Sequence, residues 1–580
     1  MSSIRSAALR SRCFPISACV FGVLCAWTTS ASGGAIQTQP AAGEPLNGLT
    51  SDQLDRFTQG QFRYNETLTA PQGLGPVFNK ASCGNCHNAP VGGPGSQAVT
   101  RFGFIDEKGN FDPLDELGGS LLQIAGIQIP DPENPKLLID CFEFLPDKSV
   151  ANVTAFRVTN GAMGYGLVEA IADGDLLDVE AAQAKAGLVS GKAHIVGAFE
   201  DDLDHVGRFG WKAQVPSMLT FSGDASLNEM GLTNQFVGEE NLPNGDAELL
   251  ATCDLVADPE DQPDGQGVTF VERVTDFQRF LAPPPQTPRS GMAGEAVFMN
   301  IGCGECHSPS FTTPDDPALE DSIRNKAIRP YSDFLLHDMG DLGDLIVQGD
   351  AEGREMKTPP LWGVRYRDPM LHDGRVGAGD LTFRLTEVIG WHGVSGSEAQ
   401  FAAANYNALS QAEKDQLLAF IDSLGRREFD FDYEQTDVGG TIDIFDWFAF
   451  ADCYGGGPYS PDDACAIGDV NQDGFVDATD AEAFATVFPG FTGDCNENGV
   501  NDLVDILDGT STDKNDNVIP DECECPADFN GDKVVDGADL GQLLLLFGTF
   551  CFCPQDLTGN FFVDGADLGQ LLLDWGTCGN

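Results

Sequence analysis

The sequence predicts a mainly α-helical protein built from several domains. At 580 residues the chain is too long for a single hydrophobic core. Two Cys-x-x-Cys-His motifs lie far apart, at 83–87 and 303–307, and the last part of the chain repeats short Asp- and Asn-rich loops that each precede a leucine-rich helix. These observations predict two helical domains, each with one motif, and a C-terminal α-helical repeat region.

The chain is strongly acidic. It has 32 Lys and Arg against 90 Asp and Glu, a formal net charge of −58 and a sequence pI near 4.1. A surface with this charge repels nucleic acid and attracts cations, so no nucleic-acid partner is expected. The acidity is concentrated in the last third of the chain, where Asp and Asn recur in short loops. This pattern favours calcium binding.

Residues 1–34 have the layout of a secretory signal peptide followed by the start of a linker. Arg5, Arg10 and Arg12 precede an apolar run from Cys13 to Trp27, and small residues follow. This order is typical of cleaved export signals. A membrane anchor is the alternative, but the run is shorter than the roughly 20 apolar residues that span a bilayer. We therefore expect a periplasmic, cell-surface or secreted protein, with its cysteines in an oxidising compartment.

The two Cys-x-x-Cys-His motifs are attachment sites for c-type haem. Their residues are Cys83, Cys86 and His87 in the first, and Cys303, Cys306 and His307 in the second. Two thiols at this spacing can join the two vinyl groups of one porphyrin, and the adjacent imidazole then ligates its iron. A zinc site would need four ligands, and a redox dithiol would need no histidine. The sequence therefore predicts two covalent haem c groups, with an apolar helix leading into each motif.

Three acidic loops have the spacing of EF-hand calcium sites. Oxygen-bearing side chains occupy loop positions one, three, five, nine and twelve: Asp469, Asn471, Asp473, Asp477 and Asp480; Asp528, Asn530, Asp532, Asp536 and Asp539; Asp556, Thr558, Asn560, Asp564 and Asp567. Side-chain oxygens at these positions are the ligands that calcium prefers. Position twelve is Asp instead of Glu and one helix follows each loop, so the repeats are similar to dockerin type I repeats. That resemblance implies a cohesin-like or cell-surface partner.

The rest of the C-terminal region is less regular. Residues 439–446 look like a degenerate copy of the same loop, and residues 494–505 and 513–524 resemble shorter calcium repeats. A solvated acidic linker is the alternative for the last two segments. Eight cysteines between 453 and 578 are expected to form disulfides, in a connectivity that the sequence leaves open.

Five further segments carry a family resemblance: 73–79, 207–213, 330–340, 357–363 and 371–375. Together with the haem motifs they resemble the dihaem oxidoreductase (peroxidase) family, which is related to bacterial dihaem cytochrome c peroxidases. The resemblance covers residues 45–425. It implies two cytochrome c-like haem domains, at 45–285 and 286–428, followed by the calcium-binding repeats at 429–580.

The resemblance also implies roles for particular residues. In the relatives one haem takes electrons from a small donor protein and the other meets peroxide. Glu229 lies in a segment similar to the one that places a glutamate over the peroxidatic haem, which makes it the candidate acid/base. Trp211 matches a tryptophan between the haems and is the candidate electron relay. Thr358, Pro359 and His372 are expected near the haem interface.

His392 is the predicted distal ligand of the second haem. In the relatives this haem takes a methionine one short helix beyond a turn similar to 372–374, and His392 falls at that position. A core histidine is the alternative for His392, and His337 is the next candidate ligand. Met230, Met339 and Met356 are possible thioether ligands that are more typical of core packing.

The first haem domain is expected to contain a mixed α/β insertion. Residues 137–144 and 153–158 alternate like strands, and 175–186 has a helical pattern. Cys141 and Cys253 are candidates for a disulfide, residues 282–288 for a stiff proline linker, and 411–424 for a helix.

The predicted function is that of an exported dihaem oxidoreductase of the peroxidase type. One alternative is an oxygenase or a protein-oxidising dihaem enzyme. Another is a plain electron-transfer cytochrome, in which both haems would be six-coordinate and inert to peroxide.

Overall fold

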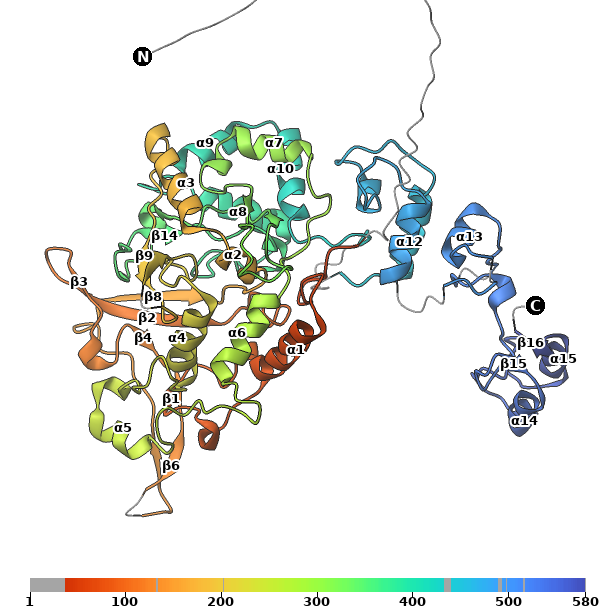
Figure 1. Cartoon of the computed structure of the whole chain (residues 1–580), viewed down its shortest axis with the longest axis horizontal. Coiled ribbons are helices and arrows are strands. Elements are labelled where there is room, and N and C mark those ends of the chain that lie inside the picture. Colours follow the sequence, from red (N-terminus) through yellow and green to blue (C-terminus); the bar gives the residue numbers. More distant parts are fainter. Residues whose placement is uncertain are drawn as a thin grey trace, which may run out of the picture.

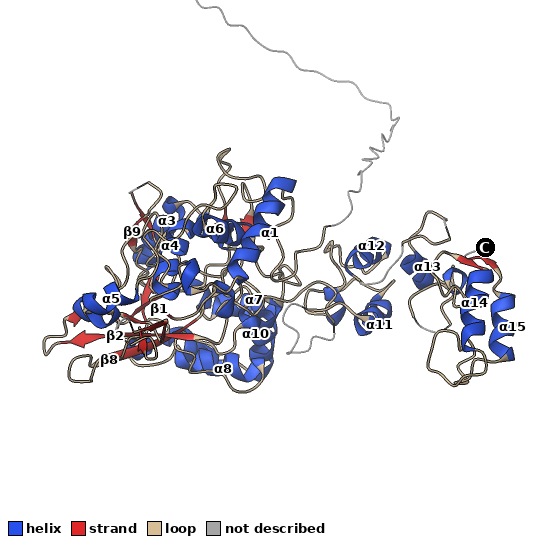
Figure 2. Ribbon diagram, turned by 90° about the horizontal axis from the view of Figure 1, so that it is seen from below, coloured by secondary structure: helices blue, strands red, loops and turns tan. Residues whose placement is uncertain are grey.

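The computed structural model describes residues 37–131, 134–201, 203–431, 440–488, 493–496, 498–514 and 517–578. The predicted signal peptide lies outside the described residues. Figures 1 and 2 show a large body formed by the first two thirds of the chain and a smaller C-terminal part that extends to one side. None of the described helices is long and apolar enough to cross a membrane. We call 37–281 the N-terminal region, 282–431 the middle region and 440–578 the tail.

The described N-terminal region has six α-helices. They are α1 (Ser51–Asn65), α2 (Tyr165–Glu169), α3 (Asp173–Ala186), α4 (Met218–Met230), α5 (Ala247–Cys253) and α6 (Phe270–Phe280). Capping boxes at Thr50 and Thr269 begin α1 and α6. The Phe277 ring of α6 lies 5.2 Å from that of Phe57 and 4.8 Å from that of Tyr64. The helix expected at 175–186 is confirmed as part of α3.

The mixed insertion is present, as expected. Its strands are β1 (Val77–Phe78), β2 (Ala98–Ile105), β3 (Phe111–Asp112), β4 (Leu121–Leu122), β5 (Ala125–Gly126), β6 (Gln128–Pro130), β7 (Leu138–Asp140), β8 (Val153–Val158), β9 (Ile195–Gly197) and β10 (Asp204–Val206). Antiparallel β2 and β8 pair from Ala98↔Val158 to Gly103↔Val153. Alternate side chains of β8 are buried, which is the pattern that predicted this strand.

The strand expected at 137–144 is shorter than predicted, since only β7 at 138–140 forms. Cys141 is bonded to Cys253, with the Cα atoms 6.0 Å apart, and the Phe144 amide donates to the Asn244 side chain at 2.8 Å. These bonds hold the following residues against the end of α5 instead of a neighbouring strand. The predicted Cys141–Cys253 disulfide is confirmed.

The middle region is built on four helices. They are α7 (Ala293–Asn300), α8 (Leu381–Trp391), α9 (Gln400–Ala408) and α10 (Gln411–Ser423), accompanied by the strand pairs β11 (Phe311–Thr312) with β12 (Ala327–Ile328) and β13 (Leu336–Asp338) with β14 (Glu355–Lys357). Phe298 of α7 and Phe420 of α10 meet with ring centroids 5.5 Å apart. The helix expected at 411–424 is confirmed as α10.

The proline-rich segment 282–288 is not a free spacer. Ala282, Gln286 and Thr287 are buried, and Pro283 and Pro284 lie close to Gly164 and Gly363. The segment therefore packs between the N-terminal and middle regions. The apolar surfaces on both sides bury it, which the local proline content did not reveal.

The tail contains two separate hydrophobic cores. Its elements are α11 (Ile444–Cys453), α12 (Ala478–Val487), α13 (Asp502–Asp508), α14 (Gly537–Leu546), α15 (Gly565–Leu573), β15 (Val534–Val535) and β16 (Gly576–Thr577). One core joins α11, α12 and α13 around Phe450 and Phe484, and the other joins α14 and α15 around Leu543 and Leu571. The expected disulfides are confirmed as Cys453–Cys465, Cys495–Cys523, Cys525–Cys578 and Cys551–Cys553.

We expect the Gly60→Ala variant to be less stable than the wild type. A Cβ at Gly60 of α1 would lie 2.3 Å from the Arg273 carbonyl oxygen of α6. Forcing an atom into packed helices costs about 1–3 kcal/mol. The control is Gly174→Ala in α3, where a Cβ meets nothing within 4 Å and alanine favours the helix. Denaturant unfolding measures both variants, and equal free energies of unfolding would contradict the expectation.

Candidate functional site

The second motif opens onto a large apolar cavity. Helix α7 leads into the turn at Cys303–Glu305, as expected, and the His307 amide donates to the Cys303 carbonyl at 3.0 Å. The space between the cavity's lining residues, including the part that is open to solvent, is about 1430 Å³. Its walls come from α7, β13, β14, α8 and α9, and they include Cys303, Cys306, His307, Trp211, Thr358, Pro359, His372 and His392. The structure thus brings residues that are far apart in the sequence to one site.

His307 is held in one orientation by the backbone. Its Nδ1 donates to the carbonyl of buried Tyr331 at 2.8 Å. This bond sets the tautomer and leaves Nε2 free to ligate a metal. Burial lowers the pKa of His307 to about 4, so the imidazole is neutral at physiological pH.

His392 has the same arrangement on the opposite element. It follows α8, and its Nδ1 donates to the Val388 carbonyl at 2.7 Å, which again leaves Nε2 free. Burial lowers its pKa. His392 also contributes electrostatically to the lowered pKa of His307, so the two imidazoles are near each other. Two neutral imidazoles with free Nε2 atoms in an apolar cavity suit both axial positions of one haem.

His337 also borders the cavity but has no free nitrogen. Its Nδ1 donates to Glu398 and its Nε2 to Asp333, both at 2.9 Å. Burial opposes protonation, but these hydrogen bonds raise the pKa of His337 well above its usual value. A protonated imidazole cannot ligate iron, which favours His392 over His337 as the distal ligand.

The other candidate ligands are engaged in hydrophobic packing or in hydrogen bonds. Met339 and Met356 pack with Trp211 in a small hydrophobic cluster at the cavity wall. His194 is hydrogen-bonded to the Lys212 carbonyl, and His205 to two aspartates away from both motifs.

The first motif is approached by a strand and not by the expected helix. Gly75 and Pro76 do not favour a helix, and β1 follows them. The Gly75 amide donates to the Met230 carbonyl at 3.0 Å, and the Asn79 amide to the Glu229 carbonyl at 2.8 Å. These bonds fasten the segment before Cys83 to the end of α4. Helix α1 contacts the motif instead, through Tyr64, whose ring lies 6.0 Å from that of His87.

His87 is buried in this site. Burial lowers its pKa to about 4, and the backbone carbonyls of Asn160 and Gly93 partly oppose this effect. Neither carbonyl completes a hydrogen bond with the buried Nδ1. His87 is therefore a neutral imidazole, suited to ligate iron from one side.

Glu229 lies beside the first motif. It sits in the last turn of α4, and its Oε2 accepts from the Asn79 Nδ2 at 2.7 Å. Burial raises its pKa, partly opposed by Asn79 and Arg101. Burial, and after it the negative charge of Glu229, raises the pKa of Cys86 to about 11. The Glu229 carboxylate therefore lies close to the Cys86 thiol. The Sδ of Met230 lies 4.0 Å from the Cys83 Sγ.

Trp211 lies between the two motifs. It borders the cavity of the second motif, and its Nε1 donates to the Val158 carbonyl at 2.9 Å. Thr159, next in the chain, interacts with Cys86, and Asn160 with His87. The Val158 carbonyl that accepts from the indole is thus only one or two residues along the chain from the residues that interact with the first motif.

Some residues of the two sites were not predicted individually. Asn79, Tyr331 and Asp333 fall within segments that carried the family resemblance, so their sequence signal was present. Arg101 of β2 interacts electrostatically with Glu229, and no sequence pattern marks it. Its role depends on the pairing of β2 in the insertion sheet.

The three regular acidic loops of the tail fold alike. Position one accepts backbone amides of the loop, as when Asp469 accepts from Asp473 and Gly474. Position nine caps the following helix. Position twelve (Asp480, Asp539 or Asp567) is fully buried. The carboxylates therefore turn inward, and burial raises the pKa of Asp480 to about 6.

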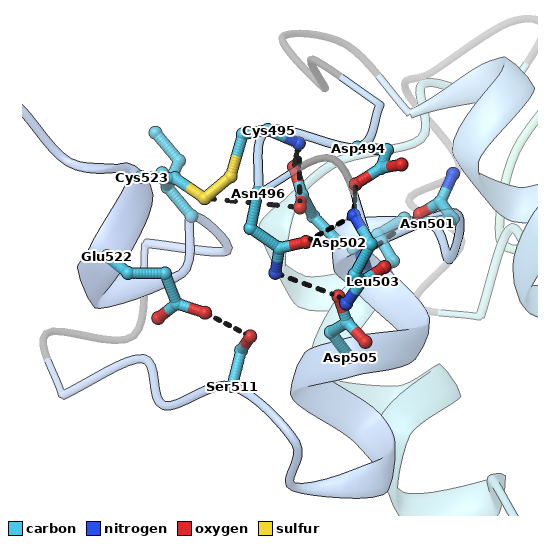
Figure 3. Close-up of a disulfide and its surroundings, with 12 residues drawn as sticks. Asp494, Cys495, Asn496, Asn501, Asp502, Leu503, Asp505, Ser511, Glu522 and Cys523 are labelled. Carbon is cyan, nitrogen blue, oxygen red and sulfur yellow. Dashed lines mark hydrogen bonds between the residues drawn. A yellow bond between two sulfur atoms is a disulfide. The ribbon is translucent and has the colours of Figure 1, made fainter. Parts of the chain in front are cut away.

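The loop at 494–505 is also ordered (Figure 3). Asp494 accepts from the Asn498 and Gly499 amides at 3.0 and 2.8 Å, and Asp505 accepts from the Asn496 side chain at 3.2 Å. The Cys495–Cys523 disulfide closes this unit, so Cys495 and Cys523 are not free thiolate ligands. The described residues of the segment, 494–496 and 498–505, thus form a hydrogen-bonded loop that leads into α13.

No curated protein matches this chain. Among solved structures, hydrazine synthase from Kuenenia stuttgartiensis is 15% identical, with a TM-score of 0.27, over 67% of this chain and 96% of that one. A MauG-like protein associated with microbial copper homeostasis is 14% identical, with a TM-score of 0.29, over 67% and 93%. Neither score is high enough to support an argument.

The family comparison covers part of the chain. The matched residues, 147–424, include Glu229, Trp211, the second motif and His392, whereas the first motif precedes them. The match supports a dihaem redox protein. Over residues 147–424 the chain is similar to the family described as "Di-haem oxidoreductase, putative peroxidase".

Proposed function

We propose that the chain is an exported dihaem c-type cytochrome oxidoreductase with peroxidase activity. The observation that carries this proposal is the difference between the two sites. The second motif faces two imidazoles with free Nε2 atoms, whereas the first combines His87 with the buried carboxylate of Glu229. The paired imidazoles at the second motif suit a closed electron-transfer haem, whereas His87 with Glu229 at the first motif suits a haem that reacts with peroxide.

The residues that hold the cofactors follow from this difference. Cys83, Cys86 and His87 hold one haem c. Cys303, Cys306, His307 and His392 hold the other. When bound, the haem irons supply the electrons and the open coordination position that peroxide reduction requires.

Glu229 is proposed to move the proton. Its carboxylate takes a proton from one oxygen of hydrogen peroxide and returns it to the other as the O–O bond breaks. With two electrons and two further protons, both oxygens leave as water. The Asn79 amide, which donates to Oε2 at 2.7 Å, holds the carboxylate in place. Burial raises the pKa of Glu229, which brings its two protonation states closer in energy near neutral pH.

Trp211 is proposed to relay electrons between the two haems. The hydrogen bond to Val158, followed by Thr159 and Asn160 beside the first motif, supports this role. A small electron-donor protein would supply the electrons through the haem on His307.

The tail is proposed to bind calcium and to attach the enzyme to a cohesin-like or cell-surface partner. The inward carboxylates of its loops support calcium, since such loops repel themselves until a divalent cation neutralises them. Together with the predicted signal peptide, this implies a periplasmic, cell-surface or secreted enzyme.

The Glu229→Gln variant should keep both haems and lose about 10²–10⁴-fold in peroxidase rate, because it cannot accept a proton. The wild-type rate should fall as pH drops through the raised pKa of Glu229, since protonation removes the base, and the variant should lack this decline. Exposed Glu239→Gln is the control. Stopped-flow spectra with peroxide measure the rates. A wild type whose haems ignore peroxide would instead be an electron carrier.

The His392→Ala variant should convert one low-spin haem to high-spin, because it loses an axial imidazole. EPR and near-infrared spectra of the holoprotein report the spin state. His337→Ala is the matched comparison, since this histidine borders the same cavity but both its nitrogens are occupied. A low-spin spectrum that persists in His392→Ala and disappears in His337→Ala would reverse the assignment.

Chelation of calcium should melt the tail and leave the haem regions folded. Calcium at a hundred times its Kd adds about 2.7 kcal/mol per site to folding, and each loop binds only when folded. Calorimetry with and without chelator follows the tail, and haem absorbance follows the rest. Asp539→Asn should weaken the calcium effect. Asp574→Asn, which removes a charge beyond α15, should not; a tail indifferent to calcium would refute the proposal.

A further inference from the structure

Two cations, buried Lys357 and partly buried Arg367, border the cavity of the second motif, and neither contacts a carboxylate of the described residues. Lys357 ends β14 and is only 2% exposed. Its Nζ has a long hydrogen bond of 3.4 Å to the Thr358 carbonyl and lies 5.6 Å from the centre of the Phe334 ring. The Arg367 guanidinium lies over Trp211, 5.8 Å from the ring centre, and donates to the Asn160 side chain at 3.4 Å.

The nearby acid is already occupied. Asp333 interacts electrostatically with Lys357, but its Oδ2 accepts from Gln183 at 2.8 Å and from His337 at 2.9 Å. Its Oδ1 accepts from the Leu335 amide at 3.0 Å. The negative charge of Asp333 therefore pairs with His337 and not with Lys357.

The same fold pairs other buried cations. Arg157 and Lys212 are also buried, and both contact Asp344, at 2.6 and 3.1 Å. A buried charge without a partner is costly because it loses its hydration. Burial and the neighbouring Arg367 lower the pKa of Lys357 to about 7. Lys357 and Arg367 thus form a positive patch in an otherwise apolar wall, which requires an anion.

We infer that Lys357 and Arg367 bind the propionate groups of the haem attached to Cys303 and Cys306. The inference rests on the proposed function, because it presupposes that haem. A haem carries two carboxylates on one edge, and the rest of its surface is apolar, which matches two cations in an apolar cavity. Because Arg367 lies over Trp211, the propionate edge then lies on the Trp211 side of the cavity.

The test is the reduction potential of the His307 haem in the holoprotein, titrated by visible spectroscopy. Lys357→Met should lower the potential, because a positive charge near the haem stabilises the reduced state. Arg367→Gln should lower it in the same direction, and Lys357→Arg should retain the wild-type value. Exposed Lys326→Met removes the same charge from the surface of the middle region and should shift the potential much less.

Haem content, from mass and absorbance, is measured first. If the second haem is missing from the wild type, the proposed function and this inference both fail. If both haems are present and Lys357→Met behaves like Lys326→Met, only this inference fails. A wild-type potential that moves with added acetate, and stops moving in Lys357→Met, would show that the cations hold a diffusible carboxylate and would also overturn it.

Discussion

The hydrogen bond from the Trp211 indole to the Val158 carbonyl, 2.9 Å long, connects the segments that lie beside the two Cys-x-x-Cys-His motifs. Around it, the Val158 amide donates to the His372 carbonyl at 2.7 Å and the Lys357 amide to the Trp211 carbonyl at 2.9 Å. These bonds connect the end of β8, β14 and the loop before α8. Because buried backbone groups must be paired, these hydrogen bonds hold the segments beside the two motifs together.

Buried charge distinguishes the cavity from the rest of the fold. His337 is held between Asp333 and Glu398, and Asp344 serves both Arg157 and Lys212. In both sets each cation contacts at least one carboxylate. Lys357 and Arg367 are the exception at the cavity wall. An apolar cavity with paired imidazoles and unbalanced positive charge is complementary to a flat apolar ligand with an acidic edge.

The tail is stabilised differently from the N-terminal and middle regions. Its two cores are small, and four disulfides close them. The position-twelve carboxylates of its three regular loops, Asp480, Asp539 and Asp567, turn inward. Small cores with inward charge need cross-links or cations to fold, and this is the physical basis of the proposed calcium dependence of the tail. Asp462 of the tail accepts from the Ala293 amide at the start of α7, at 3.0 Å.

The sequence by itself determined the features that depend on local spacing. These are the two haem motifs, the calcium-type loops, α3, α10 and the alternating strand β8, because a few neighbouring residues specify each of them. Only the tertiary structure decided the features made by distant residues. It paired the cysteines of the tail, buried the proline segment, put a strand before Cys83, and occupied both nitrogens of His337 while leaving Nε2 of His392 free. Burial and hydrogen-bond partners arise from packing, which local sequence does not encode.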